Sequence, residues 1–205
     1  MLFSLNLLGI VSVAYLVLGV FVTSKFYPGY SHSKQFMSEL GASGSPTQQL
    51  SPIINNYPLA LMFCAFGWSI LLKSEEDFTE QLVGASIIIH GLATAFAGLF
   101  PMDRDPYTPK ASLRGQIHGL AGMFVMISLI VAPCSVLFSG SYSIVFKVFS
   151  IVCVLLTLLF LALMIKAYKK RKLSGLFQRL CYGSQLVWLA GLSVRNEMLL
   201  TLINS

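Results

Sequence analysis

Four residues of this 205-residue chain could together carry out acid–base or nucleophilic chemistry: Ser38, Glu39, Asp103 and His118. A serine hydroxyl becomes a nucleophile when a neighbouring base takes its proton, and histidine is the side chain most often used as that base. In one interpretation, Asp103 orients His118, which activates Ser38 or a water molecule. In the alternative, the serine and glutamate only cap and solubilise a loop, the aspartate pairs with a basic neighbour, and the histidine hydrogen-bonds within the protein.

A second chemistry open to the same region is metal binding by Asp103, Asp105 and His118. Carboxylate oxygens and imidazole nitrogens are ligands that hard and borderline divalent metals take in proteins. The spacing matches no strict metal motif, and ion pairs between the aspartates and nearby arginine or lysine side chains are the alternative. The sequence therefore leaves a divalent metal cofactor open.

A haem site would need two histidines on facing helices, and His90 and His118 are the candidates. His90 lies about nine residues before the end of an apolar run, so roughly 13 Å deep at about 1.5 Å per residue. His118 lies roughly 5 Å inside the next run, which enters from the same side. The depths differ by about 8 Å, and we therefore expect no haem.

The composition shows in what surroundings these residues must be positioned. The chain is 56% hydrophobic and 11% charged, with a mean hydropathy of +0.76. A soluble domain carries about 25% charged residues, so the missing charge indicates that lipid is the solvent. The predicted fold is all-α, a polytopic integral membrane bundle of about six transmembrane helices that forms a single domain over residues 1–205.

Six long apolar runs are the predicted transmembrane helices. Crossing the hydrocarbon core takes roughly 20 residues of helix, and backbone polar groups cannot stay unpaired in lipid. The runs are apolar all round, which favours helices over the short alternating segments of a barrel. They cover residues 2–23, 57–72, 82–99, 115–138, 144–168 and 176–194.

The distribution of lysine and arginine predicts the orientation. With six crossings, three loops share one side and hold eleven of these residues, whereas the other side holds three. Because cytoplasmic loops carry the excess positive charge, we expect the first side to be cytoplasmic and both termini to be outside. The net charge of +6 then reflects topology, so we expect membrane lipids and no nucleic acid as partners, with protein partners left open. The eleven are Lys25, Lys34, Arg104, Lys110, Arg114, Lys166, Lys169, Lys170, Arg171, Lys172 and Arg179.

Small residues recur at helical spacing in the third and fourth runs. Such residues let two helix backbones approach closely in a bilayer. We therefore expect the third and fourth helices to pack tightly against each other through these residues. They are Gly91, Ala95 and Gly98 in the third run, and Gly115, Gly119 and Gly122 in the fourth.

The segment between the first and second runs contains a short helical pattern. Phe36, Met37 and Leu40 fall on one helical face within residues 31–40, which predicts a short helix at the membrane interface. Such a helix would present Ser38 and Glu39 near the membrane surface. The alternative is a solvated loop.

Three strings of residues carry a family resemblance. They are Tyr27-Pro-Gly-Tyr-Ser31 followed by Ser38-Glu-Leu-Gly41, Phe100-Pro-x-Asp103 followed by His118, and Gln178-Arg179 with Trp188. These strings resemble the signatures of a prokaryotic membrane family catalogued as domain of unknown function 998, over nearly the whole chain. The resemblance implies a compact helical bundle in the inner membrane of a prokaryote. It gives weight to Ser38, Glu39, Asp103 and His118 without naming a reaction.

These features favour a protein that binds or transports a lipid or small amphiphile, because a small helical bundle presents polar loops on one face. One alternative is a membrane-interface hydrolase or lipid-modifying enzyme that uses Ser38, Glu39, Asp103 and His118. Another is an accessory subunit of a membrane complex. Whether the protein is an enzyme stays open at this point.

Overall fold

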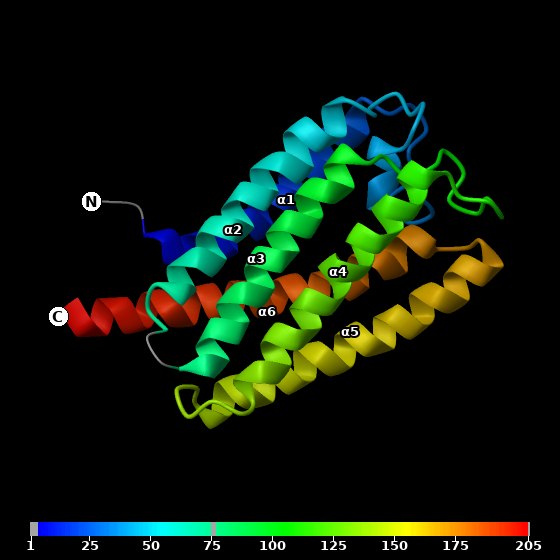
Figure 1. The fold of residues 1–205 in the computed structure, drawn as a ribbon. Helices are drawn as coiled ribbons and strands as arrows, with labels where there is room; N and C mark the ends of the chain where they lie inside the picture. Colours follow the sequence, from blue (N-terminus) through cyan, green and yellow to red (C-terminus); the bar gives the residue numbers. More distant parts are fainter. Residues whose placement is uncertain (1–3, 75–76, 205) are drawn as a thin grey trace.

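The computed structural model describes residues 4–74 and 77–204, and within them the chain forms helices and no strand (Figure 1). The predicted all-α bundle is confirmed. Residues 2 and 3, which belong to the first predicted helix, lie outside the described residues. The long helices are α1 (Leu8–Lys25), α2 (Tyr57–Leu71), α3 (Phe78–Leu99), α4 (Leu113–Val136), α5 (Ile144–Lys170) and α6 (Ser174–Asn204), and the short ones are η1 (Leu5–Leu7), η2 (Met37–Gly41) and η3 (Pro52–Asn56).

Polar side chains begin three of the helices. Asp77 accepts hydrogen bonds from the backbone N–H groups of Thr79 and Glu80 at the start of α3. Ser112 and Ser143 cap α4 and α5 in the same way. These caps satisfy N–H groups that have no partner inside the helix. Helix α3 therefore starts several residues before its apolar run does.

Helix α6 differs from the other five long helices in composition and in place. It has 31 residues, yet within the described residues it is not among the five helices apolar enough to cross a membrane. Figure 1 shows α6 passing through the bundle, and its Gln185, Trp188 and Ser193 side chains are fully buried. Its polar groups therefore face protein rather than lipid. The five apolar spans, which make this a membrane protein, are Leu5–Lys25, Pro52–Leu71, Phe78–Leu99, Leu113–Val136 and Ile144–Lys170.

The glycines of α3 and α4 make contacts other than the predicted contact between these two helices. Helix α3 packs against both α2 and α4, which confirms the predicted contact between the third and fourth helices. The glycines lie elsewhere, however, since a Cβ placed on Gly91 would meet the α2 backbone at Ala60. On α4, a Cβ on Gly119 or Gly122 would meet no atom within 4 Å. Gly115 lies instead against the Asp103 carboxylate. The prediction that α3 and α4 pack through these glycines is therefore wrong.

Helix α4 is kinked near its middle. Leu129 has the non-helical angles φ −88° and ψ 16°, and Pro133 lies one turn further along. Proline has no N–H to donate to the carbonyl of the preceding turn, and its ring crowds that carbonyl. The kink therefore has a local cause and separates the first part of α4 from its C-terminal part.

The connecting segments gather at two ends of the bundle (Figure 1). One end, here called the basic end, holds residues 26–51, 100–112 and 171–173, and it carries the eleven lysine and arginine residues counted above. Its carboxylates are Glu39, Asp103 and Asp105. The other end, here called the terminal end, holds the α2–α3 and α4–α5 connections and both chain termini. The placement of these three segments at one end confirms that the basic loops share one side.

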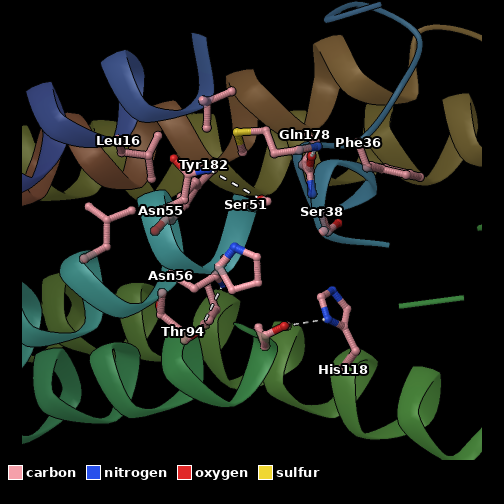
Figure 2. A pocket seen from close by; sticks show the side chains of 18 of the residues that line it. Leu16, Phe36, Ser38, Ser51, Asn55, Asn56, Thr94, His118, Gln178 and Tyr182 are labelled. Atoms are coloured by element: carbon pink, nitrogen blue, oxygen red, sulfur yellow. Dashed lines mark hydrogen bonds between the residues drawn. The ribbon is translucent and has the colours of Figure 1, made fainter. Parts of the chain in front are cut away.

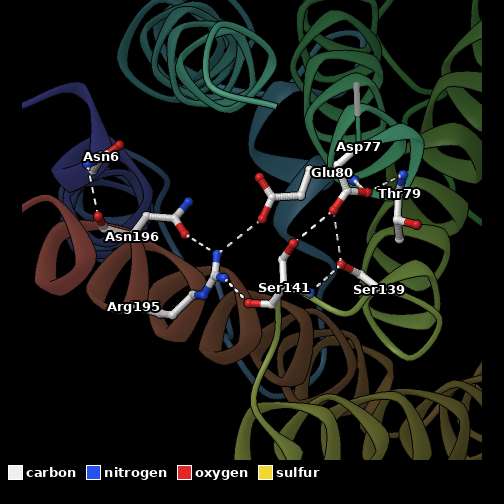
Figure 3. A network of polar contacts seen from close by, with 8 residues as sticks. All are labelled: Asn6, Asp77, Thr79, Glu80, Ser139, Ser141, Arg195 and Asn196. Carbon is white, nitrogen blue, oxygen red and sulfur yellow. Dashed lines mark hydrogen bonds and ion pairs between the residues drawn. The ribbon is translucent and has the colours of Figure 1, made fainter. Parts of the chain in front are cut away.

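The terminal end is tied together by a network of polar side chains (Figure 3). The Asp77 Oδ2 atom accepts hydrogen bonds from the hydroxyls of Ser139 at 3.2 Å and Ser141 at 2.9 Å. Arg195 lies 3.5 Å from the Glu80 carboxylate and donates to the backbone carbonyl of Ser141 at 2.6 Å. These contacts join the start of α3, the α4–α5 connection and α6.

Asn6 lies in η1, directly before α1, and extends the network to the lysine that follows α2. Its Nδ2 atom donates to the carbonyl of Asn196 at 3.2 Å and to the Glu197 carboxylate at 3.3 Å. Its Oδ1 atom accepts from Lys73 Nζ at 2.8 Å. Within the described residues, no buried side-chain atom lacking a hydrogen-bond partner lies at this end. The buried polar side-chain atoms described at the terminal end therefore all have partners.

Candidate functional site

A cavity of about 290 Å³ lies inside the bundle toward the basic end (Figure 2). Residues from all six long helices, from η2 and from η3 line it. Its polar lining consists of hydroxyl, amide and imidazole groups, and none of the described residues lining it is charged. The apolar part of its wall is formed by Leu16, Val20, Leu59, Val125, Met126 and Met164.

His118 presents a free ring nitrogen to this cavity. Its Nδ1 atom lies 3.1 Å from the carbonyl of Ala97 and 2.8 Å from that of Phe100, at the end of α3. Both partners are acceptors, so Nδ1 carries the proton, and the neutral ring has an unprotonated Nε2. Figure 2 shows this second nitrogen turned toward the cavity. His118 is therefore oriented by backbone carbonyls, not by Asp103, and can accept a hydrogen bond from a ligand.

Ser38 reaches the cavity from the opposite wall. It lies in η2, whose first turn is capped by Glu39: the carboxylate accepts from the N–H of Phe36 at 2.8 Å and from Gln35 Nε2 at 3.1 Å. Glu39 is only 9% exposed. The helix predicted over residues 31–40 is thus confined to a 3₁₀ turn over Met37–Gly41. Ser38 faces the cavity, whereas Glu39 turns back to hold the loop.

Two adjacent residues of α6 hold the same loop in place. Gln178 accepts from the N–H of Met37 at 2.7 Å through Oε1, which leaves its NH₂ group as a donor on the cavity wall. Arg179 donates through Nη1 to the carbonyls of His32 at 2.5 Å and Gln35 at 2.9 Å. Its Nη2 atom donates to the Tyr30 hydroxyl at 2.7 Å and to the His32 ring at 3.3 Å. Arg179 therefore fixes the loop that carries Ser38.

The packing of this loop is reflected in two shifted pKa values. Burial raises the pKa of Tyr30, although Arg179 beside it acts in the opposite direction. Burial lowers the pKa of His32, and the charges of Arg179 and Lys25 act in the same direction. His32 is therefore neutral where it accepts from Arg179.

The predicted metal ligands do not come together. Asp103 Oδ2 accepts from the N–H of Ser112 at 2.9 Å, and Asp105 Oδ1 accepts from the N–H of Tyr107 at 2.9 Å. Within the described residues, no group of three or more histidine, cysteine, aspartate or glutamate side chains could hold a metal ion. Of the predicted site residues, the cavity receives Ser38 and His118, while Glu39, Asp103 and Asp105 shape the loops around it.

His90 serves a different set of contacts from His118. Its Nδ1 atom lies 3.1 Å from the carbonyl of Val125 and 3.2 Å from the hydroxyl of Ser128. Its Nε2 atom lies 2.9 Å from the hydroxyl of Tyr182, which lines the cavity. Since Nδ1 donates to a carbonyl, the tyrosine donates to Nε2. Both ring nitrogens of His90 are therefore engaged inside the bundle.

Two buried amide oxygens have no hydrogen-bond partner, namely those of Asn55 and Gln185, and both residues line the cavity. The Gln185 side chain donates to the carbonyl of Met126 at 2.9 Å, which leaves its Oε1 unpaired. The Asn55 oxygen instead lies against Gly19 of α1. An unpaired buried acceptor costs about 1–3 kcal/mol, and neither oxygen has more than a trace of accessible surface, so both are packing costs of the bundle and not open ligand contacts.

The sequence analysis did not predict that one face of α6 lines a cavity. Gln178, Tyr182 and Gln185 follow one another at helical spacing and all line the cavity. In the sequence, Arg179 is a topology signal and, with Gln178, part of a family signature, and neither indication places it at a site. The missed indication was that polar residues recurring on one face of a membrane helix usually face protein or a cavity.

Comparison with known proteins places this site in a family. No curated protein and no solved structure matches the chain significantly. A family model described as Protein of unknown function (DUF998) matches residues 10–195, a span that includes every residue lining the cavity. The resemblance seen in the three sequence strings is confirmed, and the chain belongs to the DUF998 family.

Proposed function

We propose that this membrane protein binds a lipid or small amphiphile in the cavity between its helices. The observation that carries the proposal is the mixed lining, in which an apolar wall faces uncharged polar groups that include His118 Nε2 and the Gln178 NH₂ group, both without a partner among the described residues. Such a lining is typical of small-molecule sites, where a few polar groups fix the orientation of a largely apolar ligand. An amphiphile supplies both parts.

The size of the cavity supports a ligand that is only partly enclosed. Small-molecule pockets span about 300–1,000 Å³, and this cavity, at about 290 Å³, is at the lower limit. Gly122 lines the cavity, and Gly119 borders open space one turn earlier on α4. Together they form a bare strip of α4, of which only Gly122 belongs to the cavity. The polar part of a lipid would occupy the cavity, and its chain would leave past Gly122 toward the bilayer.

The glycines of the strip offer a matched pair of test variants. Gly122→Leu fills the cavity, and Gly119→Leu places the same side chain outside it, since neither Cβ meets an atom within 4 Å. Native mass spectrometry of gently extracted protein should find a lipid on the wild type and on Gly119→Leu, with occupancy lower by about ten-fold on Gly122→Leu. Equal occupancy on all three proteins would reject the cavity as the binding site.

A second candidate function is a lipid hydrolase or lipid-modifying enzyme. It is favoured by the position of Ser38 and His118 on one cavity, with the His118 Nε2 atom free to take a proton from a bound hydroxyl or water. Purified wild type, Ser38→Ala and His118→Gln would be incubated with ester lipids. Hydrolysis by the wild type that both variants lose supports the enzyme; lipid retention without turnover leaves a binding protein.

We also propose that the protein resides in the cytoplasmic membrane of a prokaryote with its basic end inside. The support is the excess of lysine and arginine at that end. In a variant whose four native cysteines are replaced by serine or alanine, single cysteines introduced at the exposed positions Lys110 and Gly140 mark the two ends. A membrane-impermeant thiol reagent added to whole cells should label Gly140→Cys and spare Lys110→Cys. The opposite pattern would invert the orientation.

A further inference from the structure

The charge of the cavity contrasts with the charge of the end where it lies. Eleven cationic side chains gather at the basic end, yet none of the described residues lining the cavity is charged. Arg179, next to the lining residue Gln178, is committed to the loop carbonyls and Tyr30. A phosphate or carboxylate taken into the cavity would therefore lose its hydration without gaining a cationic partner, which is costly.

The polar atoms that reach the cavity without a partner in the described part of the chain are of both kinds. In the neutral ring, His118 Nε2 accepts hydrogen bonds, and the Gln178 NH₂ group donates them. The Ser38 hydroxyl can do either. A carbonyl or ester ligand would leave the imidazole acceptor unpaired, and an ammonium ligand would offer the amide donor nothing to bind. A hydroxyl group pairs with both, because it donates one hydrogen bond and accepts others.

We infer that the ligand is a neutral lipid alcohol, whose uncharged hydroxyl-bearing head is bound between His118 and Gln178. The inference rests on the proposed lipid-binding function and specifies its ligand class. Acylglycerols and long-chain isoprenoid or sterol-type alcohols belong to that class. Charged phospholipids do not, and they would associate with the exposed lysines and arginines of the basic end instead.

Three lipids with the same acyl chains test the head group. Dioleoylglycerol has a free hydroxyl, dioleoyl phosphatidic acid has a phosphate in its place, and acetylated dioleoylglycerol has the hydroxyl blocked. Binding of each to the full-length protein in detergent is measured by native mass spectrometry titration. Dioleoylglycerol should bind about ten-fold more tightly than either of the other two lipids. This tighter binding should be lost in Gly122→Leu and kept in Gly119→Leu.

Two polar variants test the assigned contacts. His118→Leu removes the acceptor, and Gln178→Glu keeps the oxygen that holds Met37 while removing the NH₂ donor. Each should weaken dioleoylglycerol binding by about five-fold and leave binding of the acetylated lipid unchanged. The second variant keeps the test available if the first does not fold.

The outcomes separate the inference from the function on which it rests. Two results would overturn the inference of a neutral alcohol and leave the lipid-binding function intact. Phosphatidic acid could bind more tightly than dioleoylglycerol, or all three lipids could bind equally, provided that Gly122→Leu still weakens the binding. If Gly122→Leu weakens the binding of none of the three lipids, both the inference and the proposed function are rejected.

Discussion

The two ends of the bundle use polar side chains in opposite ways. At the terminal end, Asp77, Glu80 and Glu197 each meet a donor from another part of the chain. At the basic end, the cavity receives His118 Nε2 and the Gln178 NH₂ group without a hydrogen-bond partner from the residues that the structure describes. A few polar groups of this kind orient the ligand in small-molecule sites. The contacts of the terminal end hold the helices together, whereas the open groups of the basic end are those that the proposed ligand would use.

The largest expected effect comes from Arg179→Met, which removes the clamp on the loop at the basic end. Several hydrogen bonds from a charged donor are lost, so we expect the free energy of unfolding to fall by about 3–5 kcal/mol. Lipid retention should fall with it. Thermal unfolding in detergent and native mass spectrometry measure the two effects.

The matched control is Arg179→Lys, which keeps the charge but not the forked donor geometry, and it should recover only part of the stability. A wild-type melting temperature for Arg179→Met would mean that the loop is held by other contacts. The contrast between the ends would then lose its main support.

A smaller effect is expected from Arg195→Met at the terminal end. This side chain pairs with Glu80 at 3.5 Å and lies 4.0 Å from the centre of the Tyr142 ring. Partly exposed ion pairs and cation–π contacts contribute little each, so we expect a loss of about 1–2 kcal/mol with unchanged lipid retention. Loss of the lipid in this variant would show that the two ends are coupled.

The smallest effect should appear as a pH dependence confined to the basic end. The pKa of His32 is lowered from 6.5 by burial and by the charges of Arg179 and Lys25. The unfolded state therefore binds the proton more readily, and the contribution of His32 to stability is present above pH 6.5 and lost below it. We expect lipid retention to decrease between about pH 7.5 and about pH 5.5.

His32→Gln should remove this dependence. The terminal end should not respond in the same interval, because hydrogen bonds from Ser141, Ser139 and the backbone outweigh burial and lower the pKa of Asp77 below 3.8. A decrease in retention that persists in His32→Gln would assign the response to another group.

Much of the fold follows from the sequence because long apolar runs leave few alternatives in lipid. The start of α2 could not be predicted in this way. Asn55 and Asn56 resemble loop residues in the sequence, yet they belong to the helical turn η3. Their amides bind the Thr23 hydroxyl on α1 and the Thr94 carbonyl on α3. Such contacts depend on tertiary packing, which local patterns do not reveal.

The site was predictable only in part, because the sequence does not show which way a side chain points. Ser38 and His118 were expected to lie near each other, and both line the cavity. Glu39 and Asp103 were grouped with them by residue type, but their carboxylates turn to backbone N–H groups. Sequence spacing places a carboxylate in a region without stating which way it points. In these short loops the carboxylates accept hydrogen bonds from nearby backbone N–H groups, and that local bonding sets their direction.

The polarity of α6 has a consequence for how the protein is made. Each of the other five long helices is apolar enough to partition from the translocon into lipid, whereas α6 is not among them within the described residues. Charged side chains such as Arg179 disfavour release of a lone segment into the bilayer. Because α6 follows the other five in the chain, they have left the ribosome before it emerges. We therefore expect α6 to insert against helices that are already in place, so that the cavity, which all six long helices line, is completed last.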